Sequence, residues 1–156
     1  MQLGTYRQWQ DCFLRLRQGE CSLRELETAD FGDPRLSGAA MDGFIRELEE
    51  TVNVLLNRAC RRFSRDLREV GEAGELEEIP LLARRFRREV RGVLFIKRLT
   101  FLDGDYRREL ENAIRQQLEG TWQSFYRGLQ RQAEQTPSAM LEDLIFSLRG
   151  FRLPDE

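Results

Sequence analysis

Residues 41–70 read MDGFIRELEETVNVLLNRACRRFSRDLREV, and this stretch decides the fold. Its apolar residues recur at spacings of three and four, from Met41 and Phe44 to Phe63 and Val70. That spacing is the period of an α-helix, which has 3.6 residues per turn. A helix of this length spans roughly 45 Å at 1.5 Å per residue. Such a long apolar stripe must be covered, and we expect other helices to cover it.

The two ends of this stretch also carry helical signals. Its acidic residues come early and its basic residues come late, which is the order that the helix dipole favours. Gly71 follows directly after Val70 and is predicted to end the helix in a left-handed conformation. The sequence therefore predicts one long helix over residues 37–70.

The rest of the chain repeats the helical pattern in further segments. Capping-box patterns at Thr5-x-x-Gln8 and Ser22-x-x-Glu25 predict two short helices within residues 1–36. Beyond residues 37–70, the periodicity predicts three more helices, at residues 80–99, 104–134 and 137–149. Residues 150–156 are predicted to form a tail without a helical period. We therefore expect residues 1–156 to form a single all-α domain. It should be a largely antiparallel bundle of about five to six helices, of which three are long.

The composition argues against several classes of function. The 156 residues include no histidine, which removes the usual general base, the Ser-His-Asp and Cys-His nucleophile systems, and histidine-bound metals. The three cysteines, Cys12, Cys21 and Cys60, are odd in number and lack Cys-x-x-Cys spacing, which argues against a disulfide framework and a zinc site. Cys60 lies on the apolar face of the long helix and is predicted to be a small buried hydrophobe. We expect no catalytic residues, no cofactor and no metal.

Targeting and membrane signals are also missing from the sequence. No apolar run approaches the roughly 20 residues that a membrane-spanning helix needs. Residues 1–4 do not begin a basic region followed by an apolar core, as a secretory signal would. We therefore expect a cytoplasmic protein that does not span a membrane.

The basic charge is concentrated in the middle of the chain. The net charge is −2, yet residues 58–98 carry 12 basic and 7 acidic side chains. At 100° per residue, one face of the helix predicted at 80–99 gathers Arg84, Arg87, Arg88, Arg91, Phe95 and Arg98. Guanidinium groups in a row suit the binding of phosphates. The alternative is a solvated face that the acidic loop at residues 72–78 and Glu89 neutralise.

The long helix carries a second group of arginines on its outer face: Arg58, Arg61, Arg65 and Arg68. An antiparallel hairpin would bring this end of the helix beside the start of the helix at 80–99. The two groups would then merge into one patch, provided that both faces point the same way.

An aromatic group at the edge of the helix at 104–134 is a further candidate surface. Trp122 and Tyr126 lie in line with Arg115, and such residues are frequent in protein interfaces. Either the N-terminal helix packs over them, or they form a surface for a partner or a second copy of the chain.

Two hypotheses about function follow from these patterns. The first is a non-enzymatic helical interaction or assembly protein, with a protein partner or self-association. The alternative is a small helical subunit that binds RNA or DNA backbone without sequence preference, through the arginine-rich helix face.

Overall fold

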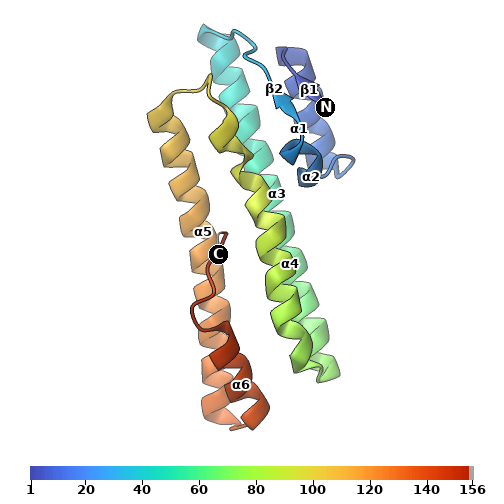
Figure 1. Cartoon of the computed structure of the whole chain (residues 1–156), viewed down its shortest axis with the longest axis vertical. Helices are drawn as coiled ribbons and strands as arrows, with labels where there is room; N and C mark the ends of the chain where they lie inside the picture. The colour runs from blue at the N-terminus through green and yellow to red at the C-terminus, as the bar shows by residue number, and fades with distance from the viewer. Residues whose placement is uncertain (155–156) are drawn as a thin grey trace. The chain divides into compact units, whose positions relative to one another are not determined.

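The stretch at residues 41–70 forms part of one continuous helix, α3 (Gly38–Ala73), in the computed structural model (Figure 1). The structure describes residues 1–154. Within them the other α-helices are α1 (Tyr6–Gln18), α2 (Leu23–Glu27), α4 (Ile79–Arg91), α5 (Gly104–Gln135) and α6 (Ala139–Leu148). The prediction of an all-α fold with about five to six helices is confirmed.

Three of these elements are long: α3, α5, and α4 together with the 3-10 helix η2 (Gly92–Arg98) that continues it. A second 3-10 helix, η1 (Leu76–Glu78), precedes α4. Consecutive long helices run antiparallel, as the short connections between them predict (Figure 1). None of the helices within residues 1–154 combines the length and apolar character needed to cross a bilayer.

Contacts within the chain group into two compact units, each of which contains part of α3 and part of α5. The first unit consists of Met1–Arg58 and Gly92–Glu111. The second consists of Ala59–Arg91 and the described chain from Asn112 onward. That residues 1–156 form one domain stays a prediction.

The core of the first unit is aromatic. Trp9, Phe13 and Phe44 are fully buried, and the rings of Trp9 and Phe44 meet edge to face with centroids 5.6 Å apart. Both predicted capping boxes are present at the starts of α1 and α2. A short parallel bridge between β1 (Gln2–Leu3) and β2 (Asp30–Phe31) was not predicted, because two residues carry no recognisable strand period.

The core of the second unit is built around Phe63 of α3. Its ring stacks on Phe86 of α4 with centroids 4.4 Å apart, and the ring of Phe125 of α5 lies 5.4 Å away. On α6, Leu141, Leu144 and Leu148 are buried. Helix α6 contacts α4, and the Tyr126 hydroxyl of α5 donates to a carbonyl of α6. Aromatic stacking between neighbouring helices therefore fixes this end of α3.

Three predicted boundaries are wrong. Gly71 does not end α3: the helix continues to Ala73, and Gly74 is the glycine with a left-handed φ of 72°. The last helix starts at Ala139 after Ser138 rather than near residue 137. The α-helix predicted over residues 80–99 ends at Arg91 and continues as a 3-10 helix, which changes the angle between successive residues.

This change of helix type moves Phe95 from the arginine face, where the α-helical period placed it, into the core. Phe95 is 5% exposed, and its ring lies 6.3 Å from that of Phe31. The change begins at Gly92, which is buried and closely approached by α2. A Cβ atom at Gly92 would lie 2.8 Å from the Leu23 Cβ.

We expect Gly92→Ala to destabilise the protein by about 1 to 3 kcal/mol, because an added methyl group collides with Leu23 in a packed interior. Urea unfolding measures this change. Gly120→Ala is the matched control: nothing lies within 4 Å of its added Cβ, so it should raise stability by about 0.5 to 1 kcal/mol. Equal effects of the two substitutions would contradict the packing described at Gly92.

Candidate functional site

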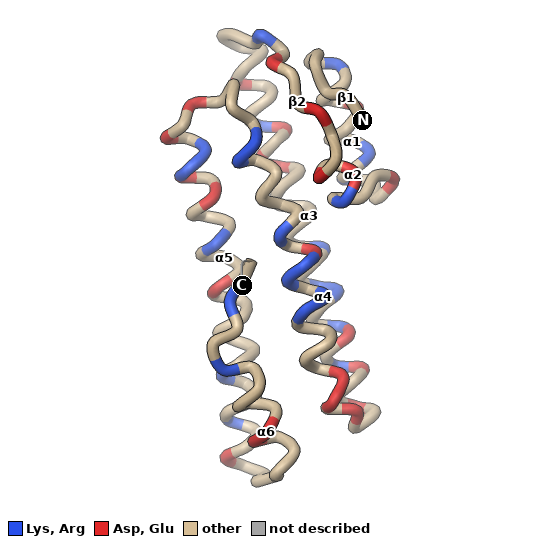
Figure 2. The backbone as a smooth tube through the Cα atoms, in the orientation of Figure 1, with Lys and Arg blue, Asp and Glu red and all other residues tan. Residues whose placement is uncertain are grey.

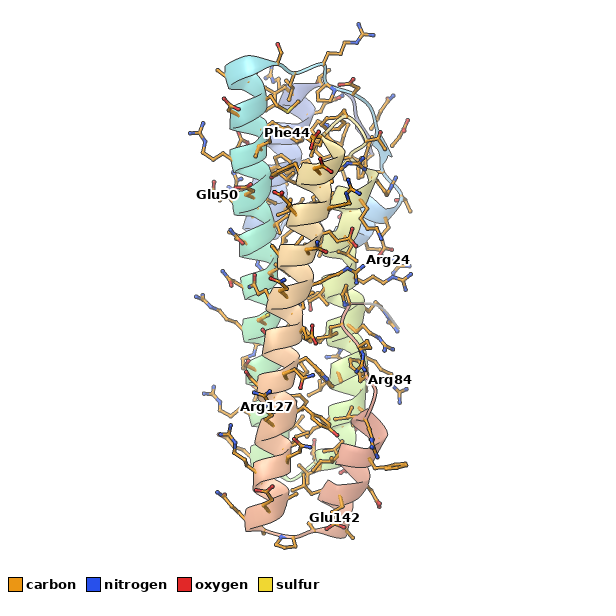
Figure 3. All side chains as sticks on the ribbon, turned by 90° about the vertical axis from the view of Figure 1, so that its left-hand side faces the viewer. Arg24, Phe44, Glu50, Arg84, Arg127 and Glu142 are labelled. Atoms are coloured by element: carbon orange, nitrogen blue, oxygen red, sulfur yellow. The ribbon has the colours of Figure 1, made fainter. Side chains whose placement is uncertain are left out.

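Three arginines on α4 project from the side opposite its buried residues. Arg84, Arg88 and Arg91 are exposed, whereas Phe86 and Val90 are 2% and 0% exposed. Figure 3 shows Arg84 pointing outward from α4. Because the three residues are spaced by four and three, they lie in one row along the helix. We refer to Arg84, Arg88 and Arg91 as the α4 arginine face.

The α4 arginine face is not neutralised within residues 1–154. No hydrogen bond or ion pair joins any of its three side chains to another described residue, including the acidic residues 72–78. Glu89, the acidic residue of α4, accepts instead from Arg62 of α3 at 3.0 Å. The row therefore presents positive charge to solvent.

Arg87, the fourth arginine predicted on this face, lies at its edge and faces an aromatic ring. Its guanidinium carbon is 4.3 Å from the centroid of Phe151, in the segment after α6. The Phe151 ring in turn lies 4.5 Å from Trp122 of α5. Arg87 is thus engaged in a cation–π contact that joins α4 to the C-terminal segment.

Arg98 is held at the end of α2. Its Nη1 donates to the carbonyls of Leu26 and Glu27 at 2.9 and 3.0 Å, and its Nη2 donates to that of Ala29 at 2.6 Å. The guanidinium also lies 4.3 Å from the centroid of Phe31. The last carbonyls of a helix have no partner within the helix, and Arg98 supplies one for α2. Arg98, which was predicted to bind a polyanion or a partner, therefore has a structural role.

Arg58 likewise supplies a hydrogen-bond donor for the last carbonyls of α1. Its Nη1 donates to the Leu16 carbonyl at 3.0 Å, and its Nη2 donates to the Arg17 carbonyl. Gly19 ends α1 with a φ of 80°, and a Cβ there would lie 3.7 Å from the Arg58 side chain. The periodicity of α3 gave no sign of this partner, because α1 is 40 residues away in sequence.

The other three arginines predicted on the outer face of α3 are exposed on the side opposite Phe63: Arg61, Arg65 and Arg68. Since Phe63 stacks on Phe86 between α3 and α4, this side faces away from α4. Arg65 also pairs with Asp66 at 3.3 Å and Glu69 at 3.9 Å. The two rows of arginines therefore stay separate, and the merged patch does not form.

The aromatic group on α5 packs inside the chain. Trp122 is 4% exposed and contacts the rings of Phe125 and Phe151. The Tyr126 hydroxyl donates to the Ile145 carbonyl of α6 at 3.4 Å. Arg115 is half-buried and has an interaction partner. The packing is intramolecular, but the expected cover is wrong: α6 and the segment after it, and not the N-terminal helix, contact Trp122 and Tyr126.

The tail after α6 contains two arginines that the sequence patterns did not single out. Arg149 and Arg152 are exposed and have no acidic partner within residues 1–154. Figure 2 shows basic residues both along α4 and in this tail. They were missed because the tail has no helical period from which a face can be derived.

The cysteines lie in apolar surroundings that suppress their reactivity. Burial raises the pKa of the Cys12 thiol to about 12, with a smaller contribution from the neighbouring Cys21. Burial also raises the pKa of Cys21 and of Cys60, which is half-buried beside Thr121. Among residues 1–154, no three Cys, Asp or Glu side chains are arranged to hold a metal ion.

We expect Arg98→Met to destabilise the protein by about 1 to 2 kcal/mol, because three backbone carbonyls lose a charged donor. Arg84→Met removes the same group from the α4 arginine face and should change stability by less than about 0.5 kcal/mol. Urea unfolding compares the two. An equally large loss of stability in Arg84→Met would contradict the distinction between a structural Arg98 and a solvent-exposed Arg84.

We expect stability to fall as pH rises above about 9. The folded state holds the Cys12 proton up to a pKa of about 12, so above the ordinary thiol pKa the unfolded state binds fewer protons and is favoured. Each such thiol contributes at most about 1.4 kcal/mol per pH unit. Urea unfolding between pH 8 and 10 should show that the free energy of unfolding depends less on pH in Cys12→Ala than in the wild type. The same pH dependence in both proteins would argue against a raised pKa of Cys12.

Comparisons with known proteins add no functional information. The chain matches no protein-family model, and no curated protein or solved structure resembles it to a significant degree. A function must therefore be argued from the arrangement of its own residues.

Proposed function

We propose that this protein is a non-enzymatic binding protein that holds RNA or DNA backbone through the α4 arginine face. The observation that carries the proposal is the row of Arg84, Arg88 and Arg91, all exposed and without an acidic partner in the described chain. Glu89, the acidic residue within α4, is engaged by Arg62 of α3.

The spacing of the row suits a chain of phosphates. Arg84 and Arg88 are separated by roughly 6 Å along the helix axis, and Arg88 and Arg91 by roughly 4.5 Å. Each guanidinium can donate two parallel hydrogen bonds to one phosphate. Contacts of this kind fix position on the backbone but carry no sequence information, so we propose binding without sequence preference.

The overall charge of −2 is compatible with this proposal. At 0.1 M ionic strength, charges more than about 10 Å apart are largely screened from each other, so the charge near the binding surface matters more than the total. Residues 58–98, which include the α4 arginine face, carry 12 basic and 7 acidic side chains.

Interaction with a protein partner, or self-association, stays a prediction. Leu81, Met140 and Phe146 are 51%, 53% and 74% exposed in the second unit, but single exposed apolar residues are normal on protein surfaces. The arginine row is the stronger observation, so nucleic acid is proposed first and a protein partner is the alternative outcome of the test.

We expect the purified protein to bind labelled RNA or DNA with strong salt dependence. Three phosphate contacts give a slope of about −3 in log K against log salt, so affinity should fall roughly sixtyfold between 50 and 200 mM salt. The variant Arg84→Gln, Arg88→Gln, Arg91→Gln should lose this binding. Fluorescence anisotropy at several salt concentrations measures both effects.

The control variant removes three exposed arginines from other surfaces: Arg7→Gln, Arg46→Gln, Arg127→Gln. Its net charge changes by the same amount, so equal losses in the two variants would indicate a general charge effect and not a site on α4. No binding of the wild type at 50 mM salt would refute the proposal and turn the search to protein partners.

A further inference from the structure

The segment after α6 returns to α4 and is fixed there by an aromatic contact. Phe151 lies between Arg87 of α4 and Trp122 of α5, at 4.3 Å from the guanidinium carbon of Arg87 and 4.5 Å from the Trp122 ring. Phe151 is half-buried and Pro154 is buried. The chain between them is therefore held against the second unit next to α4.

Arg152 follows the anchored Phe151 directly. Its Nη1 donates to the Phe151 carbonyl at 3.3 Å, so its guanidinium lies close to the anchored backbone. The side chain is exposed, and within residues 1–154 no carboxylate pairs with it. The Arg152 guanidinium is thus held at the backbone of Phe151, whose ring contacts Arg87. Arg87 lies one helical turn from both Arg84 and Arg91.

Arg87 itself is poorly placed to bind phosphate, because its guanidinium covers the Phe151 ring. Arg87 lies at the edge of the exposed row, and the ring of Phe151 in the C-terminal segment lies against it. Arg87 is therefore a positioning residue, which joins the tail to the α4 arginine face.

We propose that residues 149–154 form the second side of the nucleic-acid surface, with Arg152 as a phosphate contact that Phe151 and Arg87 position. This inference rests on the proposed function of the α4 arginine face. The backbone of RNA or DNA then contacts the α4 arginine face on one side and the Arg152 guanidinium on the other. The surface then comprises elements more than 60 residues apart in sequence, Arg84 and Arg152.

The test measures affinity and salt slope for the full chain with labelled RNA and DNA. Arg152→Gln removes one phosphate contact, so it should weaken binding by about threefold to tenfold and make the salt slope shallower by about one. Phe151→Ser removes no charge from the surface, yet it should produce a similar loss because the tail is released. Phe151→Leu keeps apolar contact with Trp122 and should lose less.

Arg127→Gln is the matched control, since Arg127 is exposed on the side of α5 opposite its buried residues (Figure 3). It should leave affinity and slope close to those of the wild type. Thermal melts by circular dichroism verify that each variant is folded. Arg152 is exposed, so its substitution tests the inference even if Phe151→Ser unfolds the protein.

The outcomes separate this inference from the proposed function. If the α4 triple variant loses binding while Arg152→Gln behaves as the wild type, the tail contact is refuted and the α4 surface stands. A loss with Phe151→Ser alone would also refute Arg152 as the contact. If the wild type does not bind at 50 mM salt, both proposals fail.

Discussion

The structure depends on covering the apolar stripe of α3 along its whole length. In the first unit, aromatic side chains of α1 pack on Phe44, which is fully buried. In the second, Phe86 and Phe125 pack on Phe63. Each contact removes a large ring from water, which is the dominant favourable contribution to folding. The positions of α4 and α5 beside this end of α3, and hence of the α4 arginine face, follow from the contacts of Phe63.

The arginines divide into two groups by what lies beside them. Arg58 and Arg98 donate to the last carbonyls of α1 and α2, which have no partner in their own helices. Arg84, Arg88 and Arg91 meet no acceptor in the described chain. Arginine suits both situations, because its planar group can satisfy several carbonyls at once and can also bind phosphate. Composition alone cannot distinguish a structural arginine from one that is left for a ligand.

Arg87 belongs to neither group, because its guanidinium makes a cation–π contact with Phe151. Arg87 of α4 fixes a segment that has no regular structure, beside Trp122 of α5. Such a contact is favourable when the guanidinium is partly removed from water. It places the C-terminal segment, with the exposed Arg152, beside α4, the helix that carries the α4 arginine face. This is the physical reason to consider the helix and the tail as one surface.

The sequence by itself determined the helices. The spacing of apolar residues predicts α3 and α5, and local capping patterns predict the starts of α1 and α2, because these signals depend only on residues within one or two turns. The exposed row at Arg84, Arg88 and Arg91 follows from the same period.

Only the tertiary structure decided the roles of Arg58, Arg98 and Phe95, and the place of Arg152. Each depends on a partner far away in sequence, such as Ala29 for Arg98. The close approach of Leu23 to Gly92, where the chain leaves the α-helical period, likewise joins distant residues. Packing between distant segments leaves no periodic trace in a single sequence, so these contacts follow only from the folded chain.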